Sequence, residues 1–208
     1  MQSHKLQSWE LMAHILERVV VNLEAARAAN REEHKLPSIP SRFDSSRVPG
    51  ITIYDYLARV HQYADCSESC YILAFIYIDR VLQKNPSFVL NKRSVHRLIL
   101  TSVVMAIKYS DDIYADNMVY SKIGGVSLPE FNGLEIEMLS LLQFDLFVHP
   151  QLYAQYVDEL QAHVTQVQPV QSEEMQEVPT ECPGTCVQPT ASMGSLGTVP
   201  SNNEMVES

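Results

Sequence analysis

The sequence predicts an all-α protein, and its apolar patterning supports that prediction in two ways. Apolar residues recur at three- and four-residue steps over most of the chain up to about residue 160, which is the spacing of a buried helix face. Two central stretches, residues 70–83 and 91–109, are apolar on nearly every side, as is typical of helices inside a bundle. No segment alternates apolar and polar residues over a useful length, so no β-strand is expected.

The chain is expected to begin with an amphipathic helix over residues 6–29, within an N-terminal segment of residues 1–33. The apolar stripe of this helix consists of Leu6, Trp9, Ala13, Leu16, Val20 and Leu23. Residues 34–50 contain three prolines and several serines, which predicts a linker between this helix and the body of the protein.

Residues 51–163 are expected to form that body, with five helices at its centre. The apolar stripe of the first helix consists of Ile53, Leu57, Val60 and Ala64. Ser67 is suited to cap the second helix, and Asn91 is expected to open the third.

The fourth and fifth helices are predicted from their end signals. Gly124 and Gly125 are suited to end a short fourth helix. Ser127 and Glu130 form an S-x-x-E capping box at the start of the fifth. The inward stripe of the fifth helix consists of Leu134, Met138, Leu141 and Leu142. One more helix is expected to start near Pro150.

The last segment, residues 164–208, contains no Lys, Arg or His and is rich in Pro, Gln, Ser, Thr and Glu. It cannot bury enough apolar surface to offset the entropy cost of ordering, so we expect it to be disordered. Such a tail could give degradation machinery an entry point, or it could be a simple solvated tail. The sequence leaves both interpretations open.

Net charge and hydropathy restrict the class of partner. The formal net charge of the 208-residue chain is −10, and the six glutamates of the tail contribute −6 of it, so the body is mildly acidic. Binding to nucleic acid is not expected, because it needs a basic face. The longest largely apolar run, Leu98–Ile107, is well short of the ~20 residues that cross a bilayer. The N-terminus has no signal-peptide core, so we expect an intracellular protein of the nucleus and/or cytoplasm, without membrane association.

Four cysteines form two C-x3-C pairs, Cys66/Cys70 and Cys182/Cys186. The spacing lies within the loose range of zinc ligands. The second pair lies in the tail, however, and no histidine pair at ligand spacing accompanies either one. We therefore expect reduced cysteines and no bound metal ion.

Asp111, Asp112 and Asp116 spell D-D-x-x-x-D, a spacing that could hold Mg²⁺ and a diphosphate in an enzyme of the isoprenoid class. Such sites need a second acidic cluster, and the later acidic pair at residues 158–159 lacks the motif's spacing. The alternative is a helix end, where the chain turns into solvent and Asp116 or Asn117 caps the next helix. The second interpretation is preferred.

Motifs of common catalytic sites are missing from the sequence. It contains no G-x-S-x-G elbow, no P-loop and no H-E-x-x-H pair. His61, His96 and His149 stand alone and are assigned no role. We predict a non-catalytic protein without a cofactor.

Three stretches, in the right order, resemble the cyclin box. "LAFIYIDRVL" at residues 73–82 resembles the second helix of cyclins, and "MAIKYSDDIY" at residues 105–114 is similar to the end of the third. "LEIEMLSLLQFDL" at residues 134–146 is similar to the fifth. The resemblance spans about residues 45–160. Its finer match is to the P/U-type cyclins of plants and the yeast phosphate-signalling cyclin, which share the "P-x-I-[ST]-I-x-x-Y-L-x-R" pattern of Pro49–Arg59.

The resemblance implies a cyclin fold: one five-helix cyclin box with an added N-terminal helix, a short C-terminal helix and the disordered tail. It implies a regulatory subunit that binds and activates a cyclin-dependent kinase as a heterodimer, in G1-type cell-cycle and cell-division control or in nutrient- and phosphate-linked control. The family's kinase-interface lysine falls on Lys108 and its glutamate partner on Glu135. Asp111 and Asp112 would then be solvated residues at the rim of that interface.

One family feature is missing from this sequence. Gly50 stands where the major cell-cycle cyclins have an arginine that pairs with the aspartate of "YIDR". Asp79 is therefore expected either to pair with Arg59 or to stay solvated, and docking of R-x-L-type substrates is not expected. A second hypothesis is a cyclin-box adaptor in transcription, and a third is the magnesium-dependent diphosphate enzyme.

Overall fold

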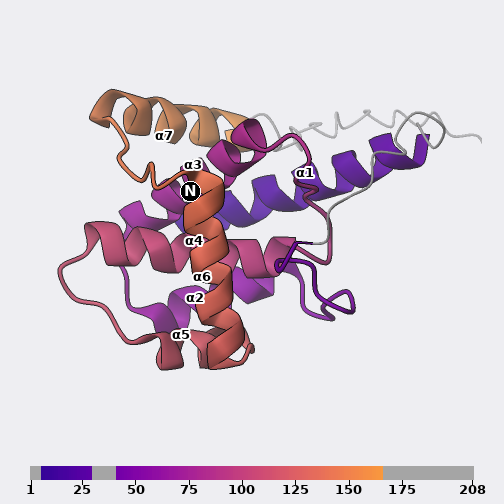
Figure 1. Ribbon diagram of the computed structural model, residues 1–208. Helices are drawn as coiled ribbons and strands as arrows, with labels where there is room; N and C mark the ends of the chain where they lie inside the picture. Colours follow the sequence, from indigo (N-terminus) through magenta and orange to yellow (C-terminus); the bar gives the residue numbers. More distant parts are fainter. Residues whose placement is uncertain (1–5, 30–40, 166–208) are drawn as a thin grey trace, which may run out of the picture. The chain divides into compact units, whose positions relative to one another are not determined.

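A computed structural model of the protein describes residues 6–29 and 41–165 (Figure 1). Within these ranges the chain is helical and has no strand, so the predicted all-α fold is confirmed. The predicted disorder of residues 164–208 concerns a segment that, apart from the end of the last helix, lies outside the described residues. The helices are α1 (Ser8–Ala29), α2 (Ile53–Ala64), α3 (Glu68–Lys84), α4 (Val95–Ser110), α5 (Asn117–Gly124), α6 (Leu128–Leu142) and α7 (Pro150–Thr165).

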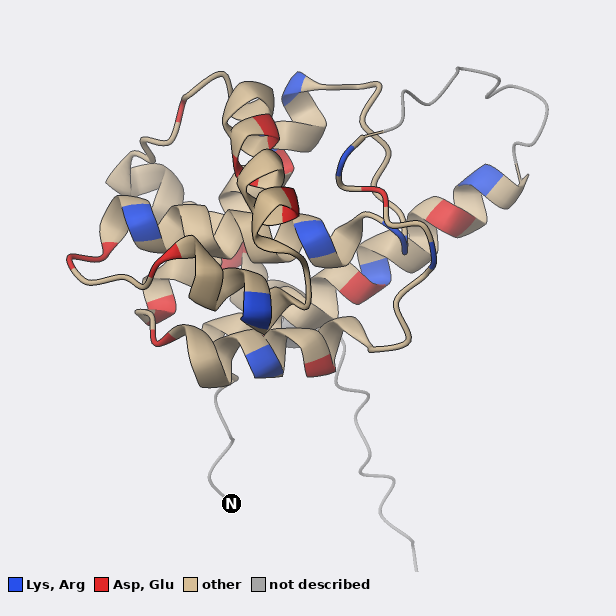
Figure 2. Ribbon diagram, turned by 60° about the horizontal axis from the view of Figure 1, so that its bottom comes forward, with Lys and Arg blue, Asp and Glu red and all other residues tan. Residues whose placement is uncertain are grey.

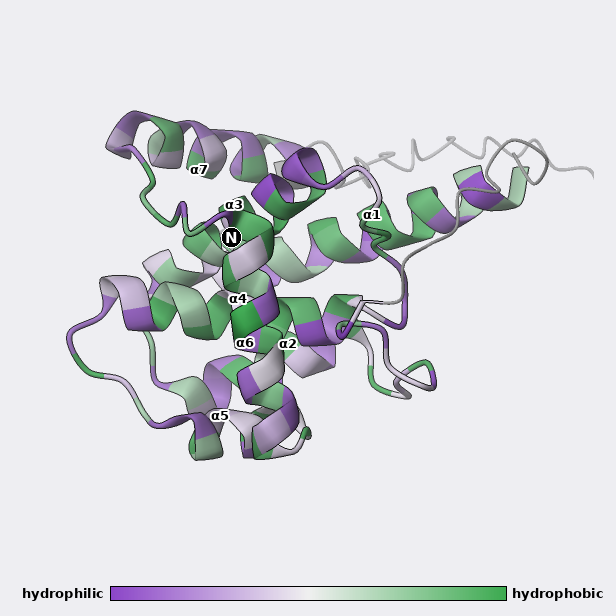
Figure 3. Ribbon diagram, viewed as in Figure 1, coloured by the Kyte–Doolittle hydropathy of each residue, from purple (hydrophilic) through white to green (hydrophobic). Residues whose placement is uncertain are grey.

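Helix α4 lies at the centre of the bundle. Every residue from Val95 to Ile107 except Arg97 is buried, as its all-round apolar sequence predicts. The helix packs along α3 and also contacts α2, α5 and α6. Figure 3 shows the apolar character that runs through these inner helices. Apart from Arg97, only the last turn of α4, from Lys108 onward, reaches the surface.

Helix α1 is part of the core. Its predicted apolar stripe is buried or half-buried against α2 and α3. The indole of Trp9 packs on the rings of Tyr54 and His61, with centroids 5.2 and 5.4 Å apart. The backbone N–H of Ser8 donates to the carboxylate of Glu68, which ties the start of α1 to the start of α3. No helix within the described ranges is long and apolar enough to span a bilayer.

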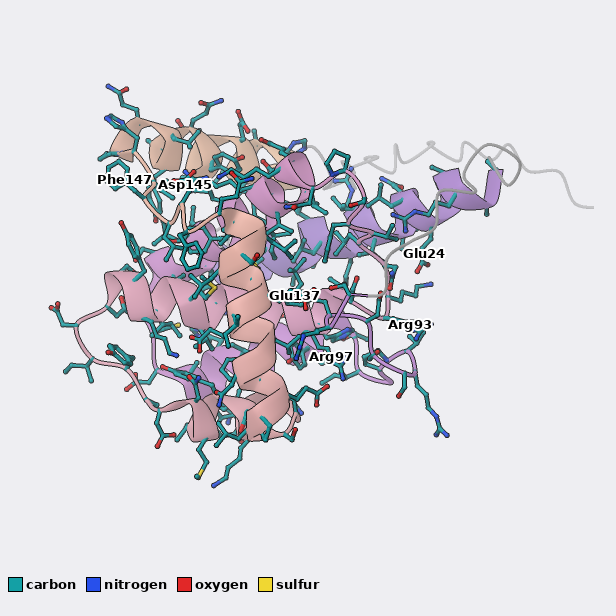
Figure 4. All side chains as sticks on the ribbon, in the orientation of Figure 1. Glu24, Arg93, Arg97, Glu137, Asp145 and Phe147 are labelled. Atoms are coloured by element: carbon teal, nitrogen blue, oxygen red, sulfur yellow. The ribbon has the colours of Figure 1, made fainter. Side chains whose placement is uncertain are left out.

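Residues 41–47, which we call the strap, run across the surface of α4 and α6. The ring of Phe43 is fully buried in the core. The hydroxyl of Ser41 donates to Glu137 on α6, at 2.7 Å. Arg97 on α4 donates to the backbone carbonyls of Arg42 and Asp44 (Figure 4). This part of the predicted linker is therefore fixed to the bundle.

Most helix ends follow the local sequence signals. Ser67 lies at the N-cap position of α3, but its hydroxyl makes no capping hydrogen bond and donates to Asp111 instead. The hydroxyl of Ser127 accepts the N–H of Glu130 and Gly125 ends α5 at a φ of 69°, as predicted. A second exception is Asn91, which was expected to open the third central helix. Its side-chain oxygen accepts the N–H groups of Arg93 and Ser94, so it holds a turn and the helix begins only at Val95.

The "YIDR" segment of α3 holds the chain where it leaves α6. The hydroxyl of Tyr77 donates to the carbonyl of Leu146, at 2.9 Å. The guanidinium of Arg80 donates to the carbonyls of Asp145 and Phe147, at 3.0 and 2.9 Å. These bonds satisfy the carbonyls of an irregular segment and fix the direction in which it departs.

Candidate functional site

Lys108 and Glu135, which the sequence places 27 residues apart, form an ion pair at the surface. The ammonium nitrogen of Lys108 lies 2.5 Å from Oε1 of Glu135. Lys108 is on the last turn of α4, where the helix leaves the core. Glu135 is on α6, between the buried Leu134 and the exposed Ile136. Their side chains are 26% and 18% exposed, so the pair is half-buried and still open to a partner.

Asn117, the first residue of α5, joins this pair. Its side-chain oxygen accepts from the Lys108 ammonium at 2.6 Å, and its side-chain nitrogen donates to Oε2 of Glu135 at 2.8 Å. The amide nitrogen also donates to the side-chain oxygen of Asn132, at 2.8 Å. Sequence reasoning missed Asn117, which it considered only as a helix cap.

Large apolar side chains are exposed on the same helices and on the segments that adjoin them. Ile136, next to Glu135, is 70% exposed, and Ile113 in the connection from α4 to α5 is 86% exposed. Phe144 and Phe147, just after α6, are 75% and 61% exposed. Figure 4 places Phe147 on the same side of the view as the α4–α5 connection. Exposed apolar side chains and half-buried charge pairs are both features that protein-binding surfaces have.

Phe144, whose side chain is largely exposed, also has an unusual backbone conformation. Gln143 and Phe144 have φ angles of 57° and 59°, a left-handed conformation that is costly for residues with a side chain. The N–H of Phe144 donates to the carbonyl of Leu139, at 3.0 Å, and so closes the end of α6. Together with the bonds from Tyr77 and Arg80, this bond holds the strained conformation. Strain that is kept in place by several contacts often marks a functional position.

The acidic residues of the D-D-x-x-x-D motif have separate local roles. The side chain of Asp116 accepts the N–H of Val119 and caps α5, as expected. Asp112 is exposed. The described residues contain no cluster of His, Cys, Asp and Glu side chains that could hold a metal ion. Figure 2 shows the acidic residues of the described chain in red.

The expectation that the carboxylate of Asp111 is left to solvent is wrong, and its place at the rim of a kinase interface stays a prediction. Its carboxylate accepts from both the N–H and the hydroxyl of Ser67, at 3.0 and 2.6 Å, and from the thiol of Cys70. Burial tends to raise the pKa of Asp111, but these hydrogen bonds outweigh it and lower the pKa below its ordinary value. Asp111 therefore links the end of α4 to the start of α3.

The expected pairing of Asp79 with Arg59 is also wrong. Oδ2 of Asp79 accepts from the hydroxyl of Tyr156 on α7 at 2.5 Å, and from the side chain of Gln83 at 2.6 Å. The guanidinium of Arg59 lies over the ring of Tyr56, 5.1 Å from its centroid. Asp79 obtains its partner from α7, which packs against α3.

Cys66 and Cys70 are free thiols near the start of α3. The thiol of Cys66 contacts the hydroxyl of Tyr71, at 3.3 Å. Cys182 and Cys186, the other predicted pair, lie outside the described residues.

The chain resembles known proteins over most of its folded part. A family model described as Cyclin matches residues 7–146, a range that includes Lys108, Asn117 and Glu135. Cyclin-U4-1 of Arabidopsis thaliana is 38% identical over 159 residues, which cover 76% of this chain and 77% of that protein. Cyclin-P4-1 of Oryza sativa subsp. japonica is 38% identical over 155 residues, which cover 74% and 73%. Cyclin-U4-2 of Arabidopsis thaliana is 39% identical over 150 residues, which cover 72% and 68%.

Proposed function

The chain belongs to the cyclin family, and we propose that the surface around Lys108 and Glu135 is where it binds and activates a cyclin-dependent kinase. Membership of this family implies a regulatory role toward such a kinase. Cyclins are regulatory subunits rather than enzymes, so the protein is a non-catalytic regulator.

The observation that carries the proposed surface is the half-buried ion pair of Lys108 and Glu135, with the exposed Ile136 next to Glu135 in α6. A partner that covers Ile136 and Phe144 would remove apolar surface from water, which supplies most of the affinity. Covering the ion pair would place two fixed charges against the partner's polar groups. Charges in such a setting determine register and specificity more than they add affinity.

The proposed activation requires no chemistry from this chain. A protein kinase transfers phosphate only when its catalytic lysine and the glutamate of its regulatory helix are paired and its metal-binding aspartate is in place. A subunit that binds this conformation more tightly than the inactive one shifts the population toward it. Moving a kinase from 1% to 99% active requires roughly a 10⁴-fold preference. A preference for the active conformation requires a rigid surface. The buried helix α4 and the end of α6, which is held by the hydrogen bonds from Tyr77 and Arg80, support such a surface.

We further propose a heterodimer with the kinase, acting in the nucleus and/or cytoplasm in cell-cycle or phosphate-linked control. The support for the pathway is the similarity to P- and U-type cyclins and the "P-x-I-[ST]-I-x-x-Y-L-x-R" segment at residues 49–59. Purification of the native protein, followed by mass spectrometry of any bound kinase, identifies the partner and separates these pathways.

Exchanging the two charges tests the surface directly. The double variant Lys108→Glu/Glu135→Lys keeps an internal ion pair but reverses the charges that a partner meets, so we expect at least a 100-fold weaker Kd for the purified kinase. Lys122→Glu is the matched control, because Lys122 is an exposed lysine of α5. Circular dichroism checks that both variants are folded. Wild-type affinity in the double variant would remove these residues from the interface.

A further inference from the structure

The side chains of Lys108, Asn117 and Glu135 form a closed ring of hydrogen bonds. The Lys108 ammonium donates to one oxygen of Glu135 and to the side-chain oxygen of Asn117. The Asn117 nitrogen donates to the other oxygen of Glu135 and completes the ring. The three residues come from α4, α5 and α6, so the ring lies where three helices meet.

Only one orientation of the Asn117 amide satisfies this ring. With the amide turned over, its N–H groups would face the ammonium of Lys108 and its oxygen would face the carboxylate of Glu135. Both contacts would be repulsive. An aspartate at position 117 could still accept from Lys108 but would repel Glu135, and an apolar residue could make neither bond. Asparagine has one acceptor and one donor group in the arrangement that the ion pair requires.

The position of Asn117 is itself fixed by contacts that do not involve Lys108 or Glu135. Asp116 caps α5 through the N–H of Val119, and the Asn117 amide has a second acceptor in Asn132. The amide is therefore held against the ion pair before any partner arrives. Of the three N–H donors of the Lys108 ammonium, the ring uses two and leaves one for a partner.

We propose that Asn117 is a positioning residue, which holds the ammonium of Lys108 and the carboxylate of Glu135 in the arrangement that the kinase recognises. This inference rests on the proposed function, because it assigns Asn117 a role at the same surface. Without Asn117 the long side chain of Lys108 regains other rotamers, and the kinase must select the productive one on binding. Because Asn117 is the first residue of α5, the arrangement of Lys108 and Glu135 then depends on where α5 lies.

The ring can be tested without a kinase. An ammonium held by two acceptors exchanges its protons slowly, so we expect a protected lysine ¹H–¹⁵N signal in NMR spectra recorded at low temperature. Loss of that signal in Lys108→Met assigns it to Lys108. We expect Asn117→Ala to remove or strongly broaden the signal and Lys122→Ala to preserve it, because Lys122 is an exposed residue of α5 outside the ring. An unchanged signal in Asn117→Ala would overturn the proposal.

Kinase binding gives the second readout. We expect the Kd of Asn117→Ala for the purified kinase to be about tenfold weaker, which corresponds to 1.4 kcal/mol, and that of Lys122→Ala to stay within about twofold. We expect Asn117→Ala to have little further effect in a Lys108→Met background, because Asn117 acts through Lys108. A merely structural Asn117 would weaken binding equally in both backgrounds, and that result would reject the positioning role.

The outcomes distinguish this inference from the proposed function. Kinase binding that depends on Lys108 but not on Asn117 rejects the positioning role and leaves the proposed function in place. Kinase binding that does not depend on Lys108 removes both.

Discussion

The hydroxyl of Tyr156 on α7 donates a hydrogen bond to Asp79 on α3, with 2.5 Å between the two oxygens. Burial raises the pKa of Tyr156, so the hydroxyl stays protonated and remains a donor over the whole physiological range. Beside this bond, Leu160 of α7 packs with Ile72 and Ile76 of α3 in a small apolar cluster. The aspartate of "YIDR" thus anchors the last helix of the described chain.

Replacing Tyr156 with phenylalanine should loosen α7. The change leaves Asp79 with only Gln83 as a described hydrogen-bond partner, so we expect a loss of about 1–2 kcal/mol in the free energy of unfolding. Urea denaturation measures it. Tyr153→Phe is the matched control on the same helix, because the Tyr153 hydroxyl has no hydrogen bond within the described part of the chain. An equal loss in both variants would mean that ring packing, not the bond to Asp79, holds α7.

Stability should fall as the pH drops from about 7.5 to 5, in part because of His96. Burial lowers the pKa of His96, whose Nε2 lies 3.0 Å from the carbonyl of Ile51. In the unfolded chain the histidine takes up a proton near its ordinary value of ~6.5. The unfolded state therefore binds more protons, and stability is lost as the pH falls from that value toward the lower pKa of the folded state.

Thermal or urea unfolding at several pH values checks this prediction. His96→Gln should reduce the slope of unfolding free energy against pH. A wild-type slope in His96→Gln would assign the pH dependence to other groups.

Phe144→Gly should make the protein more stable and a weaker kinase partner. Glycine relieves the left-handed conformation of the backbone, so we expect a gain of about 0.5–1 kcal/mol in unfolding free energy. The exposed ring is lost, so we expect about a tenfold weaker Kd for the kinase. Gln143→Gly, at a φ of 57°, should give a similar stability gain without the change in affinity. Unchanged kinase binding in Phe144→Gly would place Phe144 outside the interface.

The attachment of the strap to the helical bundle should depend mainly on the buried ring of Phe43. This ring is fully buried and packs edge-on against Phe88, with centroids 5.8 Å apart. Truncation to alanine should cost about 3–5 kcal/mol in unfolding free energy, measured by denaturation. Arg42→Ala, at an exposed position of the same strap, should change it by less than about 0.5 kcal/mol. A small effect of Phe43→Ala would show that polar contacts such as Ser41–Glu137 are sufficient to hold the strap.

Local signals in the sequence were enough to predict most of the helices. The cap at Ser127, the glycine at position 125 and the all-round apolar run of α4 each act within one or two turns, and each is confirmed. Of the predicted capping box, the Ser127 half forms, whereas the Glu130 carboxylate pairs with Arg97 instead. Lys108 and Glu135 were singled out by the resemblance to cyclins, since no local pattern joins residues 27 positions apart. The structure brings the two side chains together, and their role toward a kinase stays a prediction.

Contacts between distant residues explain what sequence reasoning missed. Asp79 accepts a hydrogen bond from Tyr156, which lies 77 residues further along the chain. Ser67 donates one to Asp111, at a separation of 44 residues. Such pairings depend on how helices pack, which local propensity does not encode. Phe43 gave one usable signal, because a lone large aromatic residue in a polar linker often marks a point of attachment. The left-handed backbone conformation of Phe144 had no signal in the sequence, because it is imposed by the hydrogen bonds that close the end of α6.

The exposure of Ile136 and Phe144 has a consequence for the protein when it is alone. Uncovered isoleucine and phenylalanine side chains attract other apolar surfaces, including those of further copies and of chaperones. Where the kinase covers these side chains as proposed, we expect a molecule without it to be more prone to aggregation and clearance than one in complex. The quantity of this protein that a cell retains should then follow the supply of kinase, so that excess subunits are eliminated without a dedicated sensor.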